Sequence, residues 1–250
     1  MCTQILGMRI DSTSYGEAVS SILAWAKSRQ SRYVCAANVH MVMEGYDHPD
    51  FRTLVNAADL ITPDGMPLVW SLRRMGFPHQ QRVYGPDLTI LLLKQAQKNK
   101  IPVGFLGSTP DTLRRLEENV RLRFPGIAIA YTFSPPFGSI STEEDDEITL
   151  GINKAGVPIL FIGLGCPKQE KWMAEHVGRV NAVMIGVGAA FDFLAGTVSQ
   201  APHWIQRSSL EWLFRLNQEP GRLWRRYLYH NPRFLILVML PLLFKHSSPI

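Results

Sequence analysis

The sequence has few cysteines and no long hydrophobic run. Its three cysteines, Cys2, Cys35 and Cys166, are an odd number and lie far apart. This pattern does not indicate a disulfide framework, so we expect a reducing compartment, the cytoplasm. The most aliphatic stretch, 234–244, is eleven residues long and contains Pro241, whereas a membrane-spanning helix needs about 20 apolar residues. We therefore expect the C-terminal end to dip into a membrane without crossing it.

Motifs for metals and dinucleotides are also missing or incomplete. No D-x-D or H-x-x-H spacing occurs, so the sequence requires no bound metal, and we expect no cofactor. The glycine-rich segments 163–170 and 186–191 each match part of a dinucleotide fingerprint but lack its third glycine. Val183 and Gln206 stand where a ribose-binding acid is expected. An NAD(P)-dependent oxidoreductase is therefore only an alternative interpretation.

The positive charge is confined to the C-terminal tail. The net charge is +5, and the segment from His203 to the end carries seven Lys/Arg against Glu211 and Glu219. The first 202 residues are balanced, with nineteen charges of each sign. A basic, aromatic tail predicts an anionic partner such as a membrane surface or a phosphate-bearing ligand. Nucleic acid is disfavoured as a partner, because the basic residues occupy one short tail that ends in an aliphatic segment.

Short apolar runs alternate with amphipathic segments along the first 202 residues. Near-continuous apolar runs are typical of strands buried on both faces of a parallel sheet. We predict an α/β fold with a Rossmann-like, mostly parallel sheet flanked by helices in residues 1–202, and a helical C-terminal appendage in residues 203–250. The acidic run within 134–147 is interpreted as the solvated start of a helix. The expected strands lie within 32–43, 58–65, 102–108, 126–133, 158–165 and 181–191, and helices are expected at 87–100 and 109–124.

Asp64 and Gly65 interrupt the apolar segment 61–70. A carboxylate in an apolar setting is costly unless it is paired, solvated or neutralised by a raised pKa. Ligands of open α/β sheets bind beyond the carboxyl ends of the strands, and Asp64 follows a predicted strand. Partial burial there would raise its pKa and suit it to act as a general base. A helix cap or a paired structural acid is the alternative for a lone aspartate.

A second strand end has the pattern of a phosphate-binding loop. Gly107 permits a tight exit from the strand, Ser108 or Thr109 suits a helix cap, and Pro110 suits the first helical turn. A helix N-terminus of this kind binds phosphate through its free N–H groups. An ordinary strand-to-helix turn is equally compatible with this sequence.

The tail contains three arginines at positions 215, 222 and 225. Spacings of seven and three place Arg215, Arg222 and Arg225 on one helical face if the segment is helical throughout. Guanidinium groups on one face would bind a diphosphate. The alternative is a basic amphipathic face that lies on anionic lipid. Its interfacial aromatic residues would be Trp204, Trp212, Trp224, Tyr227 and Tyr229.

Eight motifs in order resemble the WecG/TagA/CpsF family of bacterial glycosyltransferases over nearly the whole chain. They are AANVHMV, NAADLITPDGMPLVW, RVYGPDL, GFLGS, SPPFG, IGLGCPKQEKW, GVGAAFDFLAGTVSQAP and LEWLFRLNQEPGRLWRRYL. The resemblance implies an inverting, metal-independent enzyme that moves a sugar from a UDP-sugar to a polyprenyl-diphosphate-linked saccharide. Such enzymes act in the synthesis of cell-surface polymers and exopolysaccharides.

The resemblance also implies roles for individual residues. Asp64 occupies the position of the proposed base, and Asn38 and Gln169 match polar residues of the same pocket. The three tail arginines match arginines of an appendage that closes over the active site and meets the UDP or the acceptor diphosphate. The other predicted substrate-binding residues are Gly65, Arg82, Gly85, Asp87, Gly107, Ser108, Thr109, Gly163, Gly165, Pro167, Glu170 and Gly188.

One departure from the family concerns the donor sugar. Many members carry a threonine where this chain has Ala36, so a hydroxyl contact is missing and the donor stays open between N-acetylmannosamine, glucose and related hexoses. The resemblance places the protein peripherally on the inner face of the cell membrane. The aliphatic end predicts self-association away from the membrane. A non-catalytic, nucleotide-binding module on the membrane surface is the remaining alternative.

Overall fold

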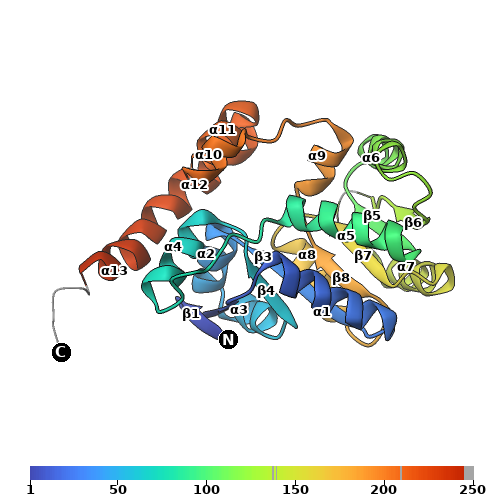
Figure 1. Ribbon diagram of the computed structural model, residues 1–250, viewed down its shortest axis with the longest axis horizontal. Coiled ribbons are helices and arrows are strands. Elements are labelled where there is room, and N and C mark those ends of the chain that lie inside the picture. The colour runs from blue at the N-terminus through green and yellow to red at the C-terminus, as the bar shows by residue number, and fades with distance from the viewer. Residues whose placement is uncertain (137, 139, 209, 245–250) are drawn as a thin grey trace.

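A six-stranded parallel sheet forms the centre of the molecule (Figure 1). The computed structural model describes residues 1–136, 138, 140–208 and 210–244. The strand order is β4-β3-β8-β7-β5-β6, and every neighbouring pair is parallel. The α/β fold and all six predicted strands are confirmed. The strands are β3 (Arg32–Ala37), β4 (Leu60–Pro63), β5 (Val103–Gly107), β6 (Ile129–Phe133), β7 (Ile159–Gly163) and β8 (Val183–Gly186).

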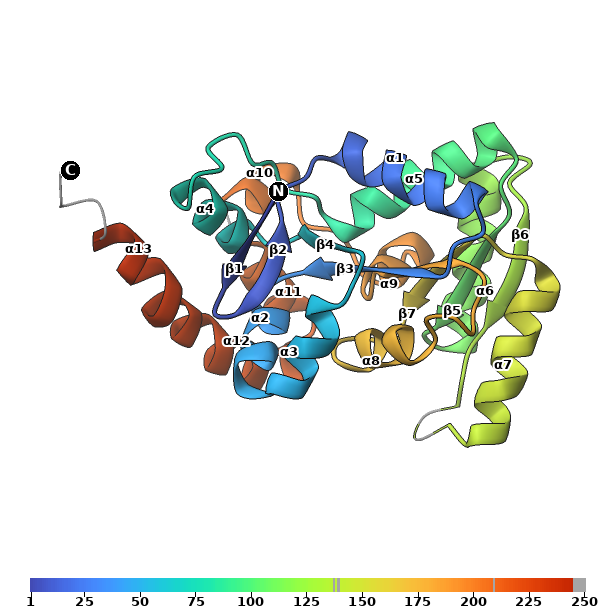
Figure 2. The same cartoon turned by 90° about the horizontal axis from the view of Figure 1, so that it is seen from below.

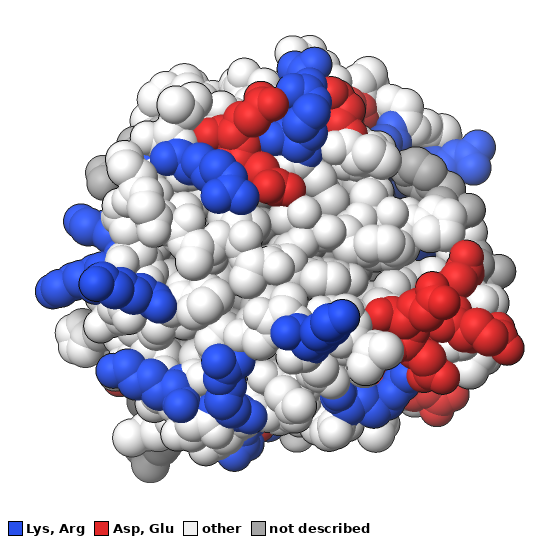
Figure 3. Space-filling view, turned by 90° about the vertical axis from the view of Figure 1, so that its right-hand side faces the viewer, with Lys and Arg blue, Asp and Glu red and all other residues white. Residues whose placement is uncertain are grey.

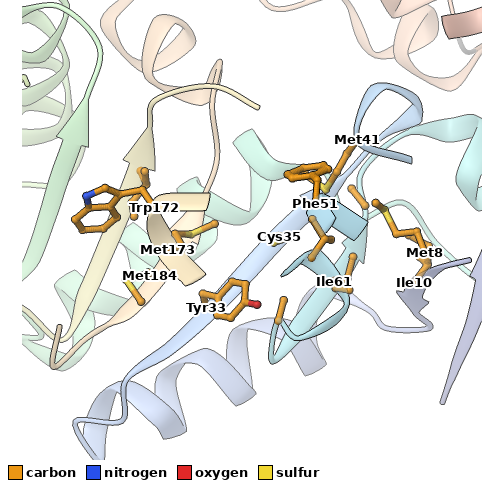
Figure 4. Close-up of a cluster of buried hydrophobic side chains, with 14 of the residues drawn as sticks. Met8, Ile10, Tyr33, Cys35, Met41, Phe51, Ile61, Trp172, Met173 and Met184 are labelled. Carbon is orange, nitrogen blue, oxygen red and sulfur yellow. The ribbon is translucent and has the colours of Figure 1, made fainter. Parts of the chain in front are cut away.

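The apolar runs form strands that are buried on both faces. In β7, Ile159 and Phe161 pack into one core, whereas Leu160 and Ile162 pack into the other. Successive side chains of a strand point to opposite faces, so a strand covered on both sides must be apolar at every position. Figure 4 shows one of the two cores, with Tyr33 and Cys35 of β3 beside side chains from the helices.

Helices cover both faces of the sheet (Figures 1 and 2). One core contains α1 (Tyr15–Lys27), α5 (Gly85–Asn99), α6 (Pro110–Arg123) and α9 (Ala190–Ala195). The other contains α2 (Val39–Asp47), α3 (Pro49–Asn56), α4 (Met66–Arg74), α7 (Thr142–Ala155) and α8 (Lys168–Glu175). The two predicted helices correspond to α5 and α6.

The acidic run in the predicted loop 134–147 is confirmed as a helix start. Ser141 caps α7, and the side chain of Glu144 accepts a hydrogen bond from the backbone N–H of Ser141. Acidic side chains in the first turn also stabilise the positive end of the helix dipole. Two residues of this loop, Phe137 and Ser139, lie outside the described residues.

An antiparallel hairpin at the N-terminus was not predicted. It consists of β1 (Cys2–Ile5) and β2 (Met8–Asp11). The side chains of Met8 and Ile10 are fully buried in the core that contains α2 and α3. The hairpin therefore closes the edge of the molecule beside β4.

The C-terminal appendage, residues 203–250, is helical over its described part, to residue 244. It comprises α10 (His203–Arg207), α11 (Glu211–Gln218), α12 (Pro220–Phe234), the π-helical segment η1 (Leu235–Met239) and α13 (Leu240–Phe244). These helices lie along one side of the molecule, and α13 extends away from the sheet (Figures 1 and 2). Within the described residues, no helix is long and apolar enough to cross a membrane. Residues 245–250, the end of the predicted appendage, are not described.

The surface at the end of the molecule opposite α13 carries mixed charge (Figure 3). Acidic side chains gather in two groups, and basic side chains lie between and around them. On α6, for example, Arg114 pairs with both Asp111 and Glu118 at 2.8 Å. The mixed charge of this face agrees with the balanced charge of residues 1–202, and the described side chains form no continuous basic patch on it.

Candidate active site

Two cavities meet at Asp64, between the carboxyl ends of the strands and the C-terminal appendage. The larger has a volume of about 1080 Å³ and the smaller about 490 Å³. Asn38, Asp64, Arg215 and Arg226 line both cavities. The core supplies the first two of these residues and the appendage supplies the other two, so the site requires both parts of the chain.

Asp64 is half-buried immediately after β4, in the wall of both cavities. Its Oδ1 accepts a hydrogen bond from the backbone N–H of Gly85 at 2.6 Å. Burial raises the pKa of the Asp64 carboxyl to about 6, although the Arg82 charge and the Gly85 hydrogen bond oppose the rise, and the Glu211 charge adds to it. The carboxylate is therefore available at neutral pH and has an unusually high proton affinity for an aspartate.

A buried polar network joins the appendage to the loop beside Asp64. Glu211, the first residue of α11, accepts hydrogen bonds from Arg82 Nη2 and from the Tyr84 hydroxyl, both at 2.7 Å. Arg82 also donates from Nε to the backbone carbonyl of Asp64, and its guanidinium lies 3.8 Å from the centre of the Tyr84 ring. Charge-assisted bonds of this kind are stronger than neutral ones. Glu211 thus holds Arg82 and Tyr84 in place beside Asp64.

Asn38 and Gln169 both line the larger cavity, as predicted. Asn38 caps α2, and its Oδ1 accepts from the backbone N–H of Met41 at 3.2 Å. Gln169 is on α8, and its Nε2 donates to Glu170 Oε1 at 2.7 Å. Among the described residues, nothing donates to the buried Oε1 of Gln169. This amide oxygen is the natural acceptor for a hydroxyl or N–H of a ligand, because an unpaired buried acceptor is costly.

The predicted phosphate-binding loop follows β5 and also lines the larger cavity at Ser108 and Thr109. The Thr109 hydroxyl caps α6 by accepting from the backbone N–H of Thr112 at 3.2 Å. Gly107 has a positive φ of 124°, and a Cβ there would lie 2.6 Å from the backbone of Gly163. Glycine is therefore needed where the ends of β5 and β7 approach each other.

Arg215, Arg222 and Arg225 were predicted to share one helical face if the segment were helical throughout. The segment is not continuously helical, and the three arginines do not share one face. The helix is interrupted between α11 and α12, where Glu219 leaves the helical conformation and α12 begins at Pro220. As a result, Arg215 and Arg222 line the larger cavity, where the exposed Arg222 also pairs with Glu219 at 2.6 Å, whereas Arg225 lines neither cavity and lies over Trp224. Arg226, the next residue along α12, is largely buried and lines both cavities in place of Arg225.

The remaining predicted residues divide between the cavity walls and the layer behind them. Gly163, Gly165 and Gly188 line the larger cavity. Gly65 and Arg82 line the smaller one. Five predicted residues lie in neither wall: Gly85, Asp87, Gly107, Pro167 and Glu170.

Each of these five residues has a supporting position. Asp87 accepts from the Tyr15 hydroxyl at 3.2 Å, and Tyr15 in turn accepts from the backbone of Tyr84. Pro167 precedes α8, and Glu170 is fully buried behind Gln169, where burial raises its pKa. Gly85 donates to Asp64 and Gly107 permits the close approach of two strand ends, as described above.

Three residues at this site were not predicted: Tyr84, Glu211 and Arg226. Tyr84 lies within the RVYGPDL motif. Glu211 was visible as one of two acids in a basic tail, a position at which a buried ion pair is a reasonable expectation. Arg226 adjoins Arg225, and only the break at Pro220 decides which of the two faces the cavity.

Cys166 and His40 lie close to the site without the features of nucleophile and base. Burial raises the pKa of the Cys166 thiol well above its ordinary value, so the reactive thiolate is not favoured. Burial lowers the pKa of His40 to about 3. His40 belongs instead to a group with Glu44 and His230, which spacing rules within one segment do not find.

Comparison with known proteins agrees with this geometry. Residues 3–248 match the sequence profile of the glycosyl transferase WecG/TagA/CpsF family. The chain is 33% identical over 209 residues to the N-acetylglucosaminyldiphosphoundecaprenol N-acetyl-beta-D-mannosaminyltransferase of Bacillus spizizenii, which covers 83% of this chain and 78% of the relative. The protein of the same name from Staphylococcus aureus (strain MW2) is 29% identical over 224 residues, 88% of this chain and 86% of the relative. The resemblance predicted from the motifs is confirmed, and this chain is a glycosyltransferase that belongs to the WecG/TagA/CpsF family.

Proposed function

We propose that this enzyme transfers a sugar, with inversion, from a UDP-sugar to a polyprenyl-diphosphate-linked saccharide. The observation that carries the proposal is the position of Asp64, a half-buried carboxylate with a raised pKa in the wall shared by two cavities. The larger cavity is assigned to the UDP-sugar. The smaller one is assigned to the acceptor.

The reaction follows from this placement. The acceptor hydroxyl oxygen attacks the anomeric carbon, its proton passes to Asp64, and the bond from that carbon to the diphosphate oxygen breaks. Gly85 holds Oδ1 of Asp64, which leaves Oδ2 to take the proton. A single displacement of this kind inverts the anomeric centre, and general-base assistance contributes about 10²–10⁴-fold in rate.

Arginines provide the positive charge for the leaving diphosphate. Arg215, Arg222 and Arg226 line the larger cavity, and the positive end of the α6 dipole at Thr109 lies beside it. Guanidinium groups bind phosphate oxygens with two parallel hydrogen bonds. These groups supply the charge stabilisation that a divalent cation supplies in other transferases, so transfer without a catalytic metal is part of the proposal.

The smaller cavity suits an acceptor with a lipid part. Its lining is largely apolar and includes Trp70, Leu235 and Met239 as well as Asp64. The relatives from B. spizizenii and S. aureus are named for an acceptor in which N-acetylglucosamine is linked through a diphosphate to undecaprenol. An acceptor of this type would place its sugar at Asp64 and its lipid along the apolar wall.

The appendage is assigned to the membrane surface. Its helices expose large apolar side chains, including Trp204, Leu228 and Ile236, each at 59% or more. An apolar surface beside arginines suits the interface of an anionic bilayer. We therefore place the protein peripherally on the inner face of the cell membrane, and away from lipid the same surface would drive self-association. Residues 1–202 would act as the UDP-sugar-binding unit and residues 203–250 as the membrane-associating unit.

The donor is proposed to be UDP-N-acetylmannosamine, with UDP-glucose and related hexoses as alternatives. The names of the relatives favour N-acetylmannosamine. Ala36 lines the donor cavity without the hydroxyl that many family members carry there.

UDP release from a panel of UDP-sugars, with a polyprenyl-diphosphate-linked N-acetylglucosamine analogue as acceptor, tests the proposal. Release with one donor is expected, and the product should have the anomeric configuration opposite to that of the donor by NMR. Retention of configuration, or UDP binding without release from any donor, would contradict it.

A further inference from the structure

Three metal-ligand side chains meet where α12 of the appendage packs against α2 of the core. His40 and Glu44 are one helical turn apart on α2, and His230 is on α12. Residues four apart lie on the same face of a helix, so both α2 side chains face α12. One potential ligand atom from each residue lies within 4.8 Å of the other two.

The distances within this group are too long for hydrogen bonds but suit a shared ion. Glu44 Oε1 lies 3.4 Å from His230 Nε2 and 3.7 Å from His40 Nδ1. Donor atoms of a tetrahedral zinc ion, with bonds of about 2.1 Å, are roughly 3.4 Å apart. The three side chains therefore need little movement to hold one ion.

The imidazoles are in the state that binds metal. The side chains of His40 and His230 are only 12% and 8% exposed, and in both cases burial lowers the pKa. Both rings are therefore neutral, and each carries a nitrogen lone pair. In the described part of the chain, no hydrogen-bond partner exists for the buried Nδ1 of either ring.

Charges near the three side chains both favour and oppose a bound cation. Glu44 contributes a negative charge, and Asp47 is paired with Arg233. The Arg226 charge lowers the pKa of both His40 and His230, which keeps the imidazoles neutral but also opposes a bound cation. Two neutral imidazoles and one carboxylate form a zinc donor set that leaves one position open.

We propose that His40, Glu44 and His230 form a site for a divalent transition metal, with Zn²⁺ the ion that best fits the ligands, which fastens the appendage to the core. His40 and His230 also line the smaller cavity, so the ion would sit in the wall of the space assigned to the acceptor, and the site itself does not depend on the proposed sugar transfer. Its effect would reach the active site through α2. Asn38 caps that helix and lines both cavities, and His40 is two residues further on. An ion joining α2 to α12 would fix Asn38 relative to the appendage arginines.

The experiment uses the full-length protein, freed of metal and titrated with Co²⁺ and then Zn²⁺. Co²⁺ bound at low coordination number by two imidazoles and a carboxylate gives visible d–d bands that are far more intense, and lie at longer wavelength, than the weak bands of hexaaqua Co²⁺, and Zn²⁺ should remove them by displacement. Zn²⁺ at about a hundred times its Kd should raise the Tm by about 5–10 °C. This increase should be absent in Glu44→Gln and His230→Gln.

His79→Gln is the matched control, because His79 is an exposed histidine outside the group. It should keep both the Co²⁺ spectrum and the Tm increase. A wild-type Co²⁺ spectrum identical to that of the free ion would overturn the site, and this result does not depend on any variant folding. Retention of the bands in Glu44→Gln or His230→Gln, or their equal loss in His79→Gln, would also overturn it.

Discussion

At the scale of single residues, the properties that suit Asp64 for catalysis also make it costly to bury. Burial raises its pKa from 3.8 to about 6, so the folded state is penalised whenever the carboxylate is charged. Well below pH 3.8 the group is protonated in both the folded and the unfolded state and the penalty vanishes. As the pH rises through 6 the penalty becomes complete and then stays constant.

Asp64→Asn should therefore make the protein more stable at pH 8. Removing the charge should raise the free energy of unfolding by about 1–3 kcal/mol at pH 8 and by much less near pH 4. Urea unfolding of the two proteins at both pH values measures this difference. A variant that is equally stable, or less stable, at pH 8 would show that the Asp64 charge is not penalised in the fold.

Glu211 should act on the reaction through the pKa of Asp64. Its charge raises the pKa of Asp64, whereas Arg82 lowers it. In Glu211→Gln the Arg82 charge remains and the opposing charge is lost, so the acidic limb of kcat/KM should move to lower pH. Arg82 and Tyr84 also lose a charged acceptor, which should lower the free energy of unfolding by about 1–3 kcal/mol.

The pH dependence of kcat/KM for wild type and Glu211→Gln measures this effect. Glu118→Gln serves as the control, because Glu118 pairs with Arg114 on the exposed surface of α6. An acidic limb at the same pH in wild type and Glu211→Gln would exclude the coupling.

Sequence reasoning found Asp64 from its chemistry and its position together, and its role as the base stays a prediction. Asp64 was identifiable because a carboxylate that interrupts an apolar strand end needs a reason to be there. Glu211 was not, because its partners Arg82 and Tyr84 are more than a hundred residues away and nothing local marks the contact.

At the scale of secondary structure, the break between α11 and α12 decides which arginines face the larger cavity, which we assign to the donor. Arg222 lines this cavity, whereas Arg225 on the same helix lines neither cavity and lies beside Trp224. We expect Arg222→Ala to weaken UDP binding by about 10-fold or more, since a hydrogen bond to a charged group contributes about 1.5–3 kcal/mol. Arg225→Ala on the same helix is the matched variant and should change UDP affinity by less than about 3-fold. Isothermal titration with UDP compares them, and equal losses would mean that Arg225 also reaches the nucleotide.

The exposed apolar side chains of η1 should anchor the appendage to lipid. Ile236 is 59% exposed, and burying an isoleucine contributes about 1.5–3 kcal/mol. Ile236→Glu should therefore weaken co-sedimentation with anionic vesicles about 10-fold or more. Leu150→Glu places the same charge at a 68% exposed leucine on α7. Equal binding by the two variants would contradict the assignment of η1 to the membrane.

The strands were predictable because each apolar run packs into both cores, as β7 does with alternate residues. The hairpin β1–β2 was not, because it depends on burial of Met8 and Ile10 against distant helices. The interruption between α11 and α12 could not be predicted from the sequence either, because proline is tolerated in the first turn of a helix. Pro220 therefore marks a helix start only once Glu219 is seen to leave the helical conformation.

At the scale of the whole molecule, the active site exists only when the appendage lies against the core. Asp64 and Asn38 come from the core, and Arg215 and Arg226 come from the appendage. The sequence indicated both parts through the change in charge near residue 203. How they pack depends on contacts such as Glu211 to Arg82, which no local pattern contains.

The most direct test of the account is UDP release by wild type and Asp64→Asn with the preferred UDP-sugar and a lipid-linked acceptor, alongside the UDP affinity of both proteins. We predict unchanged UDP affinity and a turnover lower by about 10²–10⁴-fold in the variant. Wild-type turnover by a folded Asp64→Asn protein that binds UDP normally would contradict the assignment of Asp64 as the base.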